Sequence, residues 1–313
     1  MKLNTLFSHA FLPAITAVLA ATLIASPVSA ADEIEVIDLD GITEVDFSIS
    51  GASVALVGSE RSDLELVLEK PLTGFDPSRA SKSISRDGST LVIEIEYKKT
   101  SGVFGWFSEG SKGYKSATLT LPNSLPAAIH TAGGNLSAED MNAPIKLRTA
   151  GGSIRIENVN GDTDARTSGG SIRVESVTGL VTLRTAGGSI NVEGEVAGLD
   201  ARTSGGSIKV HLNTAPQKPV TLKTSGGSVS AVLEQGTQAP ASLSTSGGSV
   251  KIELPRDQGF TLEAKSNGGN VSFRHGGAFE GTMNKRSIEG RVNGDGPLVQ
   301  LSTSGGGVSI SEI

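Results

Sequence analysis

The sequence predicts an all-β protein: a single-domain parallel β-solenoid (a β-helix) with two-strand rungs of 18–21 residues and an irregular N-terminal portion. A five-residue signature, Thr-(Ala/Ser)-Gly-Gly-(Ser/Asn), recurs at intervals of 18 and then 21 residues. Between its copies, apolar and polar residues alternate with period two, which is the pattern of half-buried strands. Beyond residue 30, no stretch carries a capped 3.6-residue apolar pattern that would indicate a helix.

The first thirty residues have the features of a secretory signal peptide. Lys2 supplies a positive start, an apolar stretch runs from Phe11 to Ala25, and small residues precede a cleavage point after Ala30. A retained membrane anchor is the alternative, but the apolar run is short and lacks downstream flanking charge. We therefore expect export by the general secretory route, to the periplasm, the cell surface or the extracellular space, with no transmembrane span after cleavage.

The composition excludes several kinds of chemistry. The 313 residues include 40 glycines and no cysteine, and the formal net charge is −6. Without cysteine there can be no disulfide, thiol nucleophile or zinc–thiolate site. The acidic balance is the opposite of what a general nucleic-acid-binding protein needs. We expect no cofactor and no nucleic-acid partner.

Residues 31–128 are predicted to form irregular β rungs of the same continuous domain. A solenoid has open ends that must be protected against edge-to-edge pairing, which suits an irregular first portion. The expected elements are a strand–Gly–strand rung over residues 45–54, strands over 63–69 and 91–97, a hairpin turn at Arg86-Asp87-Gly88, and a strand over 117–122 that enters the first clean rung.

An aromatic segment interrupts this portion between Tyr97 and Tyr114. It contains glycines and lysines together with Phe104, Trp106, Phe107 and Tyr114. Aromatic rings among lysines suit sugar rings or a lipid interface, so these four aromatics are candidate binding residues. The alternative is that they fold back and cap the apolar end of the solenoid.

Residues 129–313 are predicted to be the regular part of the solenoid. In the repeat that begins at Leu147, the apolar residues Leu147, Ile154 and Ile156 alternate with charged residues that include Arg148 and Arg155, which gives one buried and one exposed face. An antiparallel sandwich of 18-residue hairpins is the alternative, but it would not need identical corners at equal intervals. The signature begins at Thr131, Thr149, Thr167, Thr185, Thr203, Thr224 and Thr245, with degenerate copies at Ser266 and Thr303.

Each Gly-Gly pair is predicted to form a sharp corner. We expect positive φ angles there and a clash for any Cβ atom. The signature threonine has the parity of Leu147, so it should point inward with its hydroxyl bonded between rungs. The expected corner glycines are Gly133, Gly134, Gly151, Gly152, Gly169, Gly170, Gly187, Gly188, Gly205, Gly206, Gly226, Gly227, Gly247 and Gly248.

These features together resemble the bacterial putative-adhesin family, a domain family of unknown function that is named for surface adhesion. The resemblance rests on the exported N-terminus, the Leu119-Thr120-Leu121-Pro122 strand and the Gly-Gly rungs, and it covers roughly Glu33 to Ile313. It implies a β-solenoid in a cell-envelope setting with no known enzyme activity. It carries over no functional residue, and fold alone does not fix function.

A basic column precedes the signature threonines. Like charges on adjacent rungs, ~4.8 Å apart, repel by about 1 kcal/mol in water. One interpretation is local compensation by Asp164 and Asp200, with a separate acidic column at Glu157, Glu175 and Glu193. The other is a bound polyanion, such as an acidic polysaccharide or lipopolysaccharide phosphate. The column comprises His130, Arg148, Arg166, Arg184, Arg202, Lys223, Ser244 and Lys265, of which Arg148, Arg166, Arg184, Arg202 and Lys223 are the candidate binding residues.

Catalytic and metal sites are not expected. His130, His211 and His275 lack metal-ligand spacing and are expected to be solvated, and the corners lack the aspartates of calcium-binding repeats. A polysaccharide-degrading β-helix enzyme would need carboxylates that break the repeat pattern. An ice-binding threonine array is disfavoured because the threonines point inward.

The sequence thus predicts a non-catalytic exported protein. It would act as an adhesin or an envelope-binding protein for a cell-surface polysaccharide or another polyanionic polymer. The alternatives are a periplasmic structural or regulatory protein that binds an envelope protein, and the β-helix enzyme named above. The oligomeric state is left open.

Overall fold

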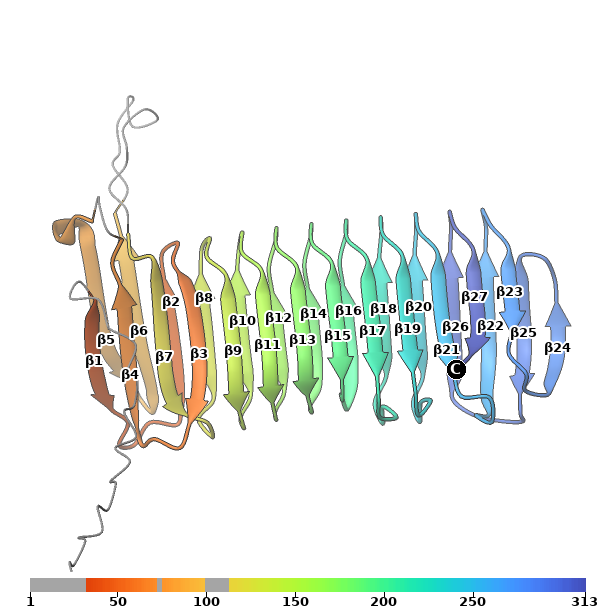
Figure 1. Ribbon diagram of the computed structural model, residues 1–313, viewed down its shortest axis with the longest axis horizontal. Coiled ribbons are helices and arrows are strands. Elements are labelled where there is room, and N and C mark those ends of the chain that lie inside the picture. The colour runs from red at the N-terminus through yellow and green to blue at the C-terminus, as the bar shows by residue number, and fades with distance from the viewer. Residues whose placement is uncertain (1–31, 72–74, 99–112) are drawn as a thin grey trace, which may run out of the picture. The chain divides into compact units, whose positions relative to one another are not determined.

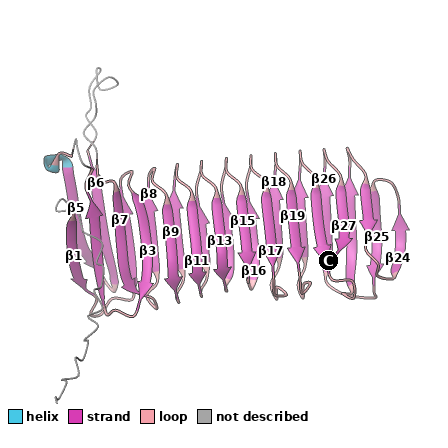
Figure 2. Ribbon diagram, viewed as in Figure 1, coloured by secondary structure: helices cyan, strands magenta, loops and turns pink. Residues whose placement is uncertain are grey.

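The computed structural model describes residues 32–71, 75–98 and 113–313. Apart from one 3-10 turn (η1, Pro77–Arg79), its regular structure is entirely β (Figure 2). The strands form a 13-stranded sheet, here called sheet A, and a 14-stranded sheet, here called sheet B. Residues Ala31–Ile313 form one compact unit, in which each regular rung gives one strand to each sheet (Figure 1). The predicted all-β solenoid is confirmed.

The regular rungs stack in parallel and in register. Ile154 lies opposite Ile172, which lies opposite Ile190. The strands in sheet B are β8 (Ala127–Thr131), β10 (Ile145–Thr149), β12 (Thr163–Arg166), β14 (Leu180–Arg184), β16 (Gly198–Arg202), β18 (Val220–Thr224) and β20 (Ala241–Thr245). Those in sheet A are β9 (Leu136–Met141), β11 (Ile154–Val159), β13 (Ile172–Val177), β15 (Ile190–Gly194), β17 (Ile208–Leu212), β19 (Val229–Leu233) and β21 (Val250–Leu254).

The core lies between the two sheets and consists of stacked columns. In sheet B, Leu147, Ala165, Leu183 and Ala201 are neighbours in register, and all four are fully buried. Large and small side chains therefore alternate along this column and interlock. Burial of each leucine contributes about 1.5–3 kcal/mol, and it is available only once neighbouring rungs are stacked.

The Gly-Gly corners differ from the prediction in one respect. None of the signature glycines adopts a left-handed φ, so the expected positive φ is wrong. The predicted clash is correct for the second glycine of each pair: a Cβ on Gly152 would lie 2.0 Å from the carbonyl oxygen of Gly134. A Cβ on Gly151 would lie 3.5 Å from its nearest neighbour, the Gly133 oxygen, which is an ordinary contact. Close approach of successive rungs, and not backbone handedness, is why the second glycine is needed.

The signature threonines tie each corner to the preceding rung, as predicted. The Thr149 hydroxyl donates to the Gly134 carbonyl at 2.9 Å and accepts from the Gly152 N–H at 3.3 Å. The same pair of bonds recurs at Thr167, Thr185, Thr203, Thr245 and Thr303. Each buried hydroxyl is therefore satisfied as both donor and acceptor.

A column of left-handed residues stands near the end of the sheet A strands. Asp140, Asn158 and Ser176 have φ values of 59°, 53° and 54°, and Gly194 has 111°. Each residue adds one position to the strand, so that a side chain such as Val159 turns inward again and is buried. The sequence analysis did not anticipate these bulges.

The N-terminal end contains the predicted strands in an order that differs from chain order. The first rung, β2 with β3, lies between the rung of β6 with β7 and the rung of β8 with β9. Antiparallel strands β1 and β4 extend sheet A, and β5 extends sheet B. The strands are β1 (Glu33–Asp38), β2 (Glu44–Ile49), β3 (Ser53–Ser59), β4 (Asp63–Glu69), β5 (Ala80–Asp87), β6 (Thr90–Tyr97) and β7 (Ser116–Pro122).

The C-terminal end has the same kind of inserted rung. The strands are β22 (Phe260–Ser266), β23 (Val271–Arg274), β24 (Phe279–Met283), β25 (Ser287–Val292), β26 (Leu298–Thr303) and β27 (Val308–Glu312). Strand β26 pairs with both β20 and β22, and β27 pairs with both β21 and β23. The last rung in the sequence is therefore second from the end in space. The hairpin of β24 and β25 pairs with the far edge of β22 and accounts for the long 37-residue interval.

Candidate functional site

The basic column forms a ladder on the outer face of sheet B. Its members stand on β10, β12, β14, β16 and β18, one per rung, and are neighbours in register. Parallel pairing sets their backbone spacing at ~4.8 Å. We call this set the arginine ladder: Arg148, Arg166, Arg184, Arg202 and Lys223.

Asp164 neutralises part of the ladder by binding two of its members. Arg166, on the same strand, donates from Nε and Nη2 to the two carboxylate oxygens at 2.9 and 3.0 Å. Arg148, on the neighbouring strand β10, donates from Nη2 to Oδ2 at 3.2 Å. Two guanidinium groups thus share one carboxylate, and the group of three keeps one net positive charge.

Asp200 repeats this arrangement two rungs further along. Arg202 donates from Nε to Oδ1 at 2.7 Å, and Arg184 donates from Nη2 to Oδ2 at 2.8 Å. We call each set of two arginines and one aspartate a triad. The local compensation that the sequence suggested is present, but only half as many carboxylates as arginines supply it.

The opposite face, on sheet A, carries as many carboxylates as cations on β11 and β13. Arg155 bonds Glu157 on its own strand β11, and Arg173 bonds Glu175 on β13. The hydrogen bond from Arg173 holds the pKa of Glu175 below its usual value. Because each arginine has a glutamate two residues later, this face lacks the excess of cations that the arginine ladder has.

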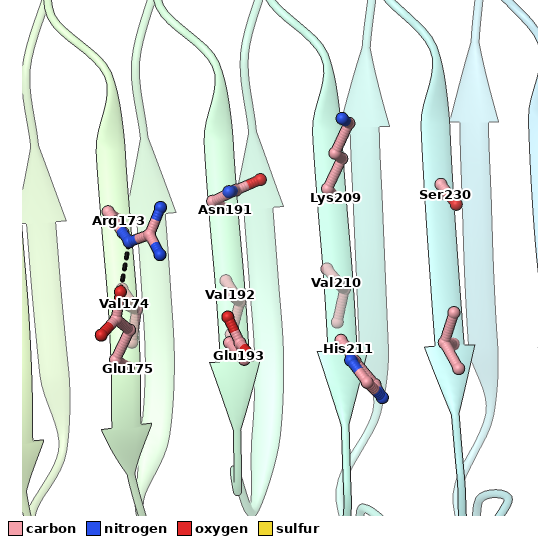
Figure 3. Close-up of a pocket in the computed structure, with 11 residues that line it drawn as sticks. Arg173, Val174, Glu175, Asn191, Val192, Glu193, Lys209, Val210, His211 and Ser230 are labelled. Carbon is pink, nitrogen blue, oxygen red and sulfur yellow. Dashed lines mark hydrogen bonds and ion pairs between the residues drawn. The ribbon is translucent and has the colours of Figure 1, made fainter.

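A hollow of about 260 Å³ opens where the pairing on sheet A is interrupted (Figure 3). Asn191 takes the position that Arg155 and Arg173 hold in earlier rungs, and its shorter side chain leaves space on β15. Glu193 consequently has no ion-pair partner among the residues described. The hollow is bordered by Lys209 and by His211, whose Nε2 lies 2.7 Å from Glu234 Oε1.

Of the four candidate residues in the aromatic segment, Tyr114 lies within the described residues. Phe104, Trp106 and Phe107 lie outside the described residues. Tyr114 is 8% exposed, and its ring lies against Phe75 with centroids 5.0 Å apart. It belongs to the interior of the N-terminal end and is not available as the exposed binding residue that the sequence suggested.

The Tyr114 hydroxyl is held by a charged group of the end strand β1. It donates to Glu33 Oε2 at 3.0 Å, and Lys70 Nζ lies 2.9 Å from Glu33 Oε1. Burial, together with the Glu33 hydrogen bond and charge, raises the pKa of Tyr114 to about 12. This cluster ties the end strand β1 to the segments that follow β4 and precede β7.

No metal-binding or membrane-spanning element was found in residues 32–71, 75–98 and 113–313. No three histidine or acidic side chains there are grouped so as to hold a metal ion. No helix in the same ranges has the length and apolarity needed to cross a membrane.

Comparison with protein families identifies the architecture. The family described as Toastrack DUF4097 matches residues 42–247, which is more than half of the chain. The chain belongs to the Toastrack family. The matched region includes the irregular rung of β2 and β3 and the regular rungs through the corner after β20, and the resemblance to a domain family of this kind is confirmed.

The solved structures that match this Toastrack chain include the following two. A protein described as a putative adhesin from Bacteroides fragilis is 14% identical, with a TM-score of 0.45, and the match covers 91% of this chain and 98% of that one. One described as a putative cell adhesion protein from Clostridium sporogenes is 10% identical, with a TM-score of 0.25, and the match covers 90% and 99%. Comparison with curated proteins finds no match.

One histidine of the Toastrack unit lies where the sequence analysis did not place it. His130 and His211 are at the surface, as expected, but His275 is 7% exposed. Its Nε2 lies 3.0 Å from the Pro255 carbonyl, and its Nδ1 accepts from the Gly277 N–H. The expectation of a solvated side chain is wrong for His275 because its ring lies against the rings of Phe260 and Phe273.

Proposed function

We propose that this Toastrack protein is exported and, without catalysing a reaction, binds an acidic polysaccharide of the cell envelope along the arginine ladder. The single observation that carries the proposal is that four arginines of the ladder share two aspartates. The family assignment supports the architecture and leaves the ligand open.

The contrast between the two faces supports this assignment. On β10–β18, the outward side chains comprise six cations and two carboxylates, whereas on the facing strands β11–β19 they comprise three cations and three carboxylates. Because the formal net charge of the chain is −6, the cationic excess on sheet B runs against the overall balance. A polyanion would be attracted to sheet B and not to sheet A.

The positions of the ladder groups also suit a polymer. The guanidinium side chains of Arg148, Arg166, Arg184 and Arg202 are between 37% and 46% exposed, whereas the two aspartates are 26% and 30% exposed. An approaching anion therefore meets the guanidinium groups first. Arginine retains free N–H donors after one carboxylate contact, and these can bind carboxylate or sulfate groups.

The binding test compares two matched double variants. Arg166→Gln with Arg184→Gln removes one guanidinium from each triad, and Arg155→Gln with Arg173→Gln removes two from the opposite face. Affinity for hyaluronan and polygalacturonate, with uncharged dextran as the reference polymer, is measured by calorimetry at low salt. We expect the sheet B variant to lose at least tenfold in affinity and the sheet A variant to lose less than twofold.

Salt dependence gives a second readout of the same contact. Binding should weaken steeply as ionic strength rises, because exposed charges are screened within about 8 Å at physiological salt. Failure of both acidic polymers to bind, or equal losses in the two double variants, would overturn the proposal. Export has its own test, in which intact cells are treated with protease before and after mild disruption of the outer membrane. Degradation in intact cells would place the protein at the cell surface, and degradation only after disruption would place it in the periplasm. Protection at both steps would contradict export.

A further inference from the structure

The aspartates of sheet B recur in every second rung of the arginine ladder. The position two residues before each ladder member is occupied, from β10 to β18, by Lys146, Asp164, Thr182, Asp200 and Thr221. The arginines recur in every rung from β10 to β16, so the two columns on this face have different periods. From β12 onward, a column with a charge in every rung therefore lies beside a column with a charge in every second rung. On β10 the second column begins with the cation Lys146, whose Nζ lies 3.7 Å from Glu44 Oε1.

This difference makes the net charge of the ladder alternate. Arg148 and Arg166 bind Asp164, and Arg184 and Arg202 bind Asp200. Arg166 and Arg184 are neighbours in register but share no carboxylate among the described residues. Each triad carries one net positive charge, and the triads are two rungs, or about 9.6 Å, apart.

From this spacing we infer that the ladder selects a linear polysaccharide with one acidic group per disaccharide over one with an acidic group on every sugar. The inference rests on the proposed function and adds the charge period of the ligand. A sugar unit in an extended chain is about as long as one rung, so successive disaccharides would follow successive triads. One acidic group would then meet one net positive charge.

A more densely charged polymer would be mismatched to the same surface. With an acidic group on every sugar, each triad would face two anionic groups with one net positive charge. The second anion would lie close to Asp164 or Asp200, and like charges brought together on binding oppose association. Without the aspartates, the ladder would instead present one cation per rung and would match the dense polymer.

The test compares hyaluronan, with one carboxylate per disaccharide, and polygalacturonate, with one per sugar, as oligosaccharides of equal sugar number. Affinities are measured by calorimetry at low and physiological salt. Wild-type protein should bind the hyaluronan oligosaccharide at least threefold more tightly, although the other ligand carries more charge. The Asp164→Asn/Asp200→Asn variant should gain about tenfold in affinity for polygalacturonate and reverse the preference.

A second variant guards against loss of structure in the double variant. Thr182→Asp leaves every arginine in place and adds a carboxylate between the triads, which should weaken binding of both oligosaccharides at least fivefold. Circular dichroism and thermal unfolding establish that each variant is folded. An unchanged preference in Asp164→Asn/Asp200→Asn, or tighter binding of polygalacturonate by wild type, would overturn the charge period while polyanion binding stands. If neither oligosaccharide bound the wild-type protein, the proposed function itself would be refuted.

Discussion

At the corner of each regular rung, the second glycine of the signature is fixed by contact with the main chain of the preceding rung. A methyl group on Gly152 or Gly170 would lie 2.0 Å from the carbonyl oxygen of the preceding second glycine. That oxygen accepts a hydrogen bond from the hydroxyl of Thr149 or Thr167, respectively, which restrains it. The first glycine of the pair has a looser environment.

This difference predicts unequal effects for two adjacent substitutions. Gly152→Ala should lower the free energy of unfolding by about 3 kcal/mol, because overpacking against rigid main chain is poorly relieved. Gly151→Ala should change it by less than about 1 kcal/mol, because its Cβ meets only an ordinary contact and its φ is not left-handed. Urea denaturation followed by circular dichroism measures both values. Equal destabilisation would show that backbone conformation, and not close approach, is what the corner requires.

At the scale of elements, the end strand β1 is held by charged side chains that face inward. Glu33 binds Lys70 and the Tyr114 hydroxyl, and Lys82 Nζ lies 2.6 Å from Glu35 Oε2. Charges turned toward the interior of an end strand are a known means of preventing edge-to-edge pairing. They also make the N-terminal end sensitive to acid.

Burial raises the pKa of Glu33, but hydrogen bonds from Lys70 and Tyr114 and the charges of Lys70 and Lys82 outweigh it, so the pKa lies below the ordinary value of 4.5. A lowered carboxylate pKa stabilises the folded state above the unfolded-state pKa, and this stability is lost as pH falls through the folded value. Between about pH 6 and about pH 3, Glu33→Gln should therefore lose less thermal stability than wild type. The exposed carboxylate variant Glu96→Gln is the control and should behave like wild type. If Glu33→Gln and wild type lost the same stability, Glu33 would have no part in acid sensitivity.

Most of the elements could be predicted from the sequence because each depends on local alternation. The strand Asp63–Glu69 has the expected bounds, and the inward threonines and the partners of Asp164 and Asp200 follow from side-chain parity alone. The left-handed Ser176 was missed because serine has no marked preference for that conformation. His275 was missed because its burial depends on contacts with Phe260 and Phe273 that no repeat signature indicates.

At the scale of the whole unit, the order of the rungs depends on more than the repeat. Thr303 and Ser266 identify two further rungs, but similar strands can pair with either neighbour, so the signature does not say which comes first in space. The structure places Thr303 against Gly248 and Ser266 against Gly306. The antiparallel hairpin of β24 and β25 occupies the other edge of β22 and leaves β26 the position beside β20.

This order predicts that damage to the last rung spreads backward along the sequence. Leu301 is 1% exposed and lies between Leu243 of β20 and Ala264 of β22, so Leu301→Asp would place a charge between two rungs. In a solenoid, stability is mainly a sum over neighbouring rungs. Hydrogen exchange should therefore accelerate throughout β22–β27, although β22–β25 precede the substitution, and stay slow in β8–β17. Ser302→Asp, on the same strand with an outward side chain opposite Lys265, should leave both regions protected. Faster exchange confined to residues 298–313 would contradict the inserted position of the last rung.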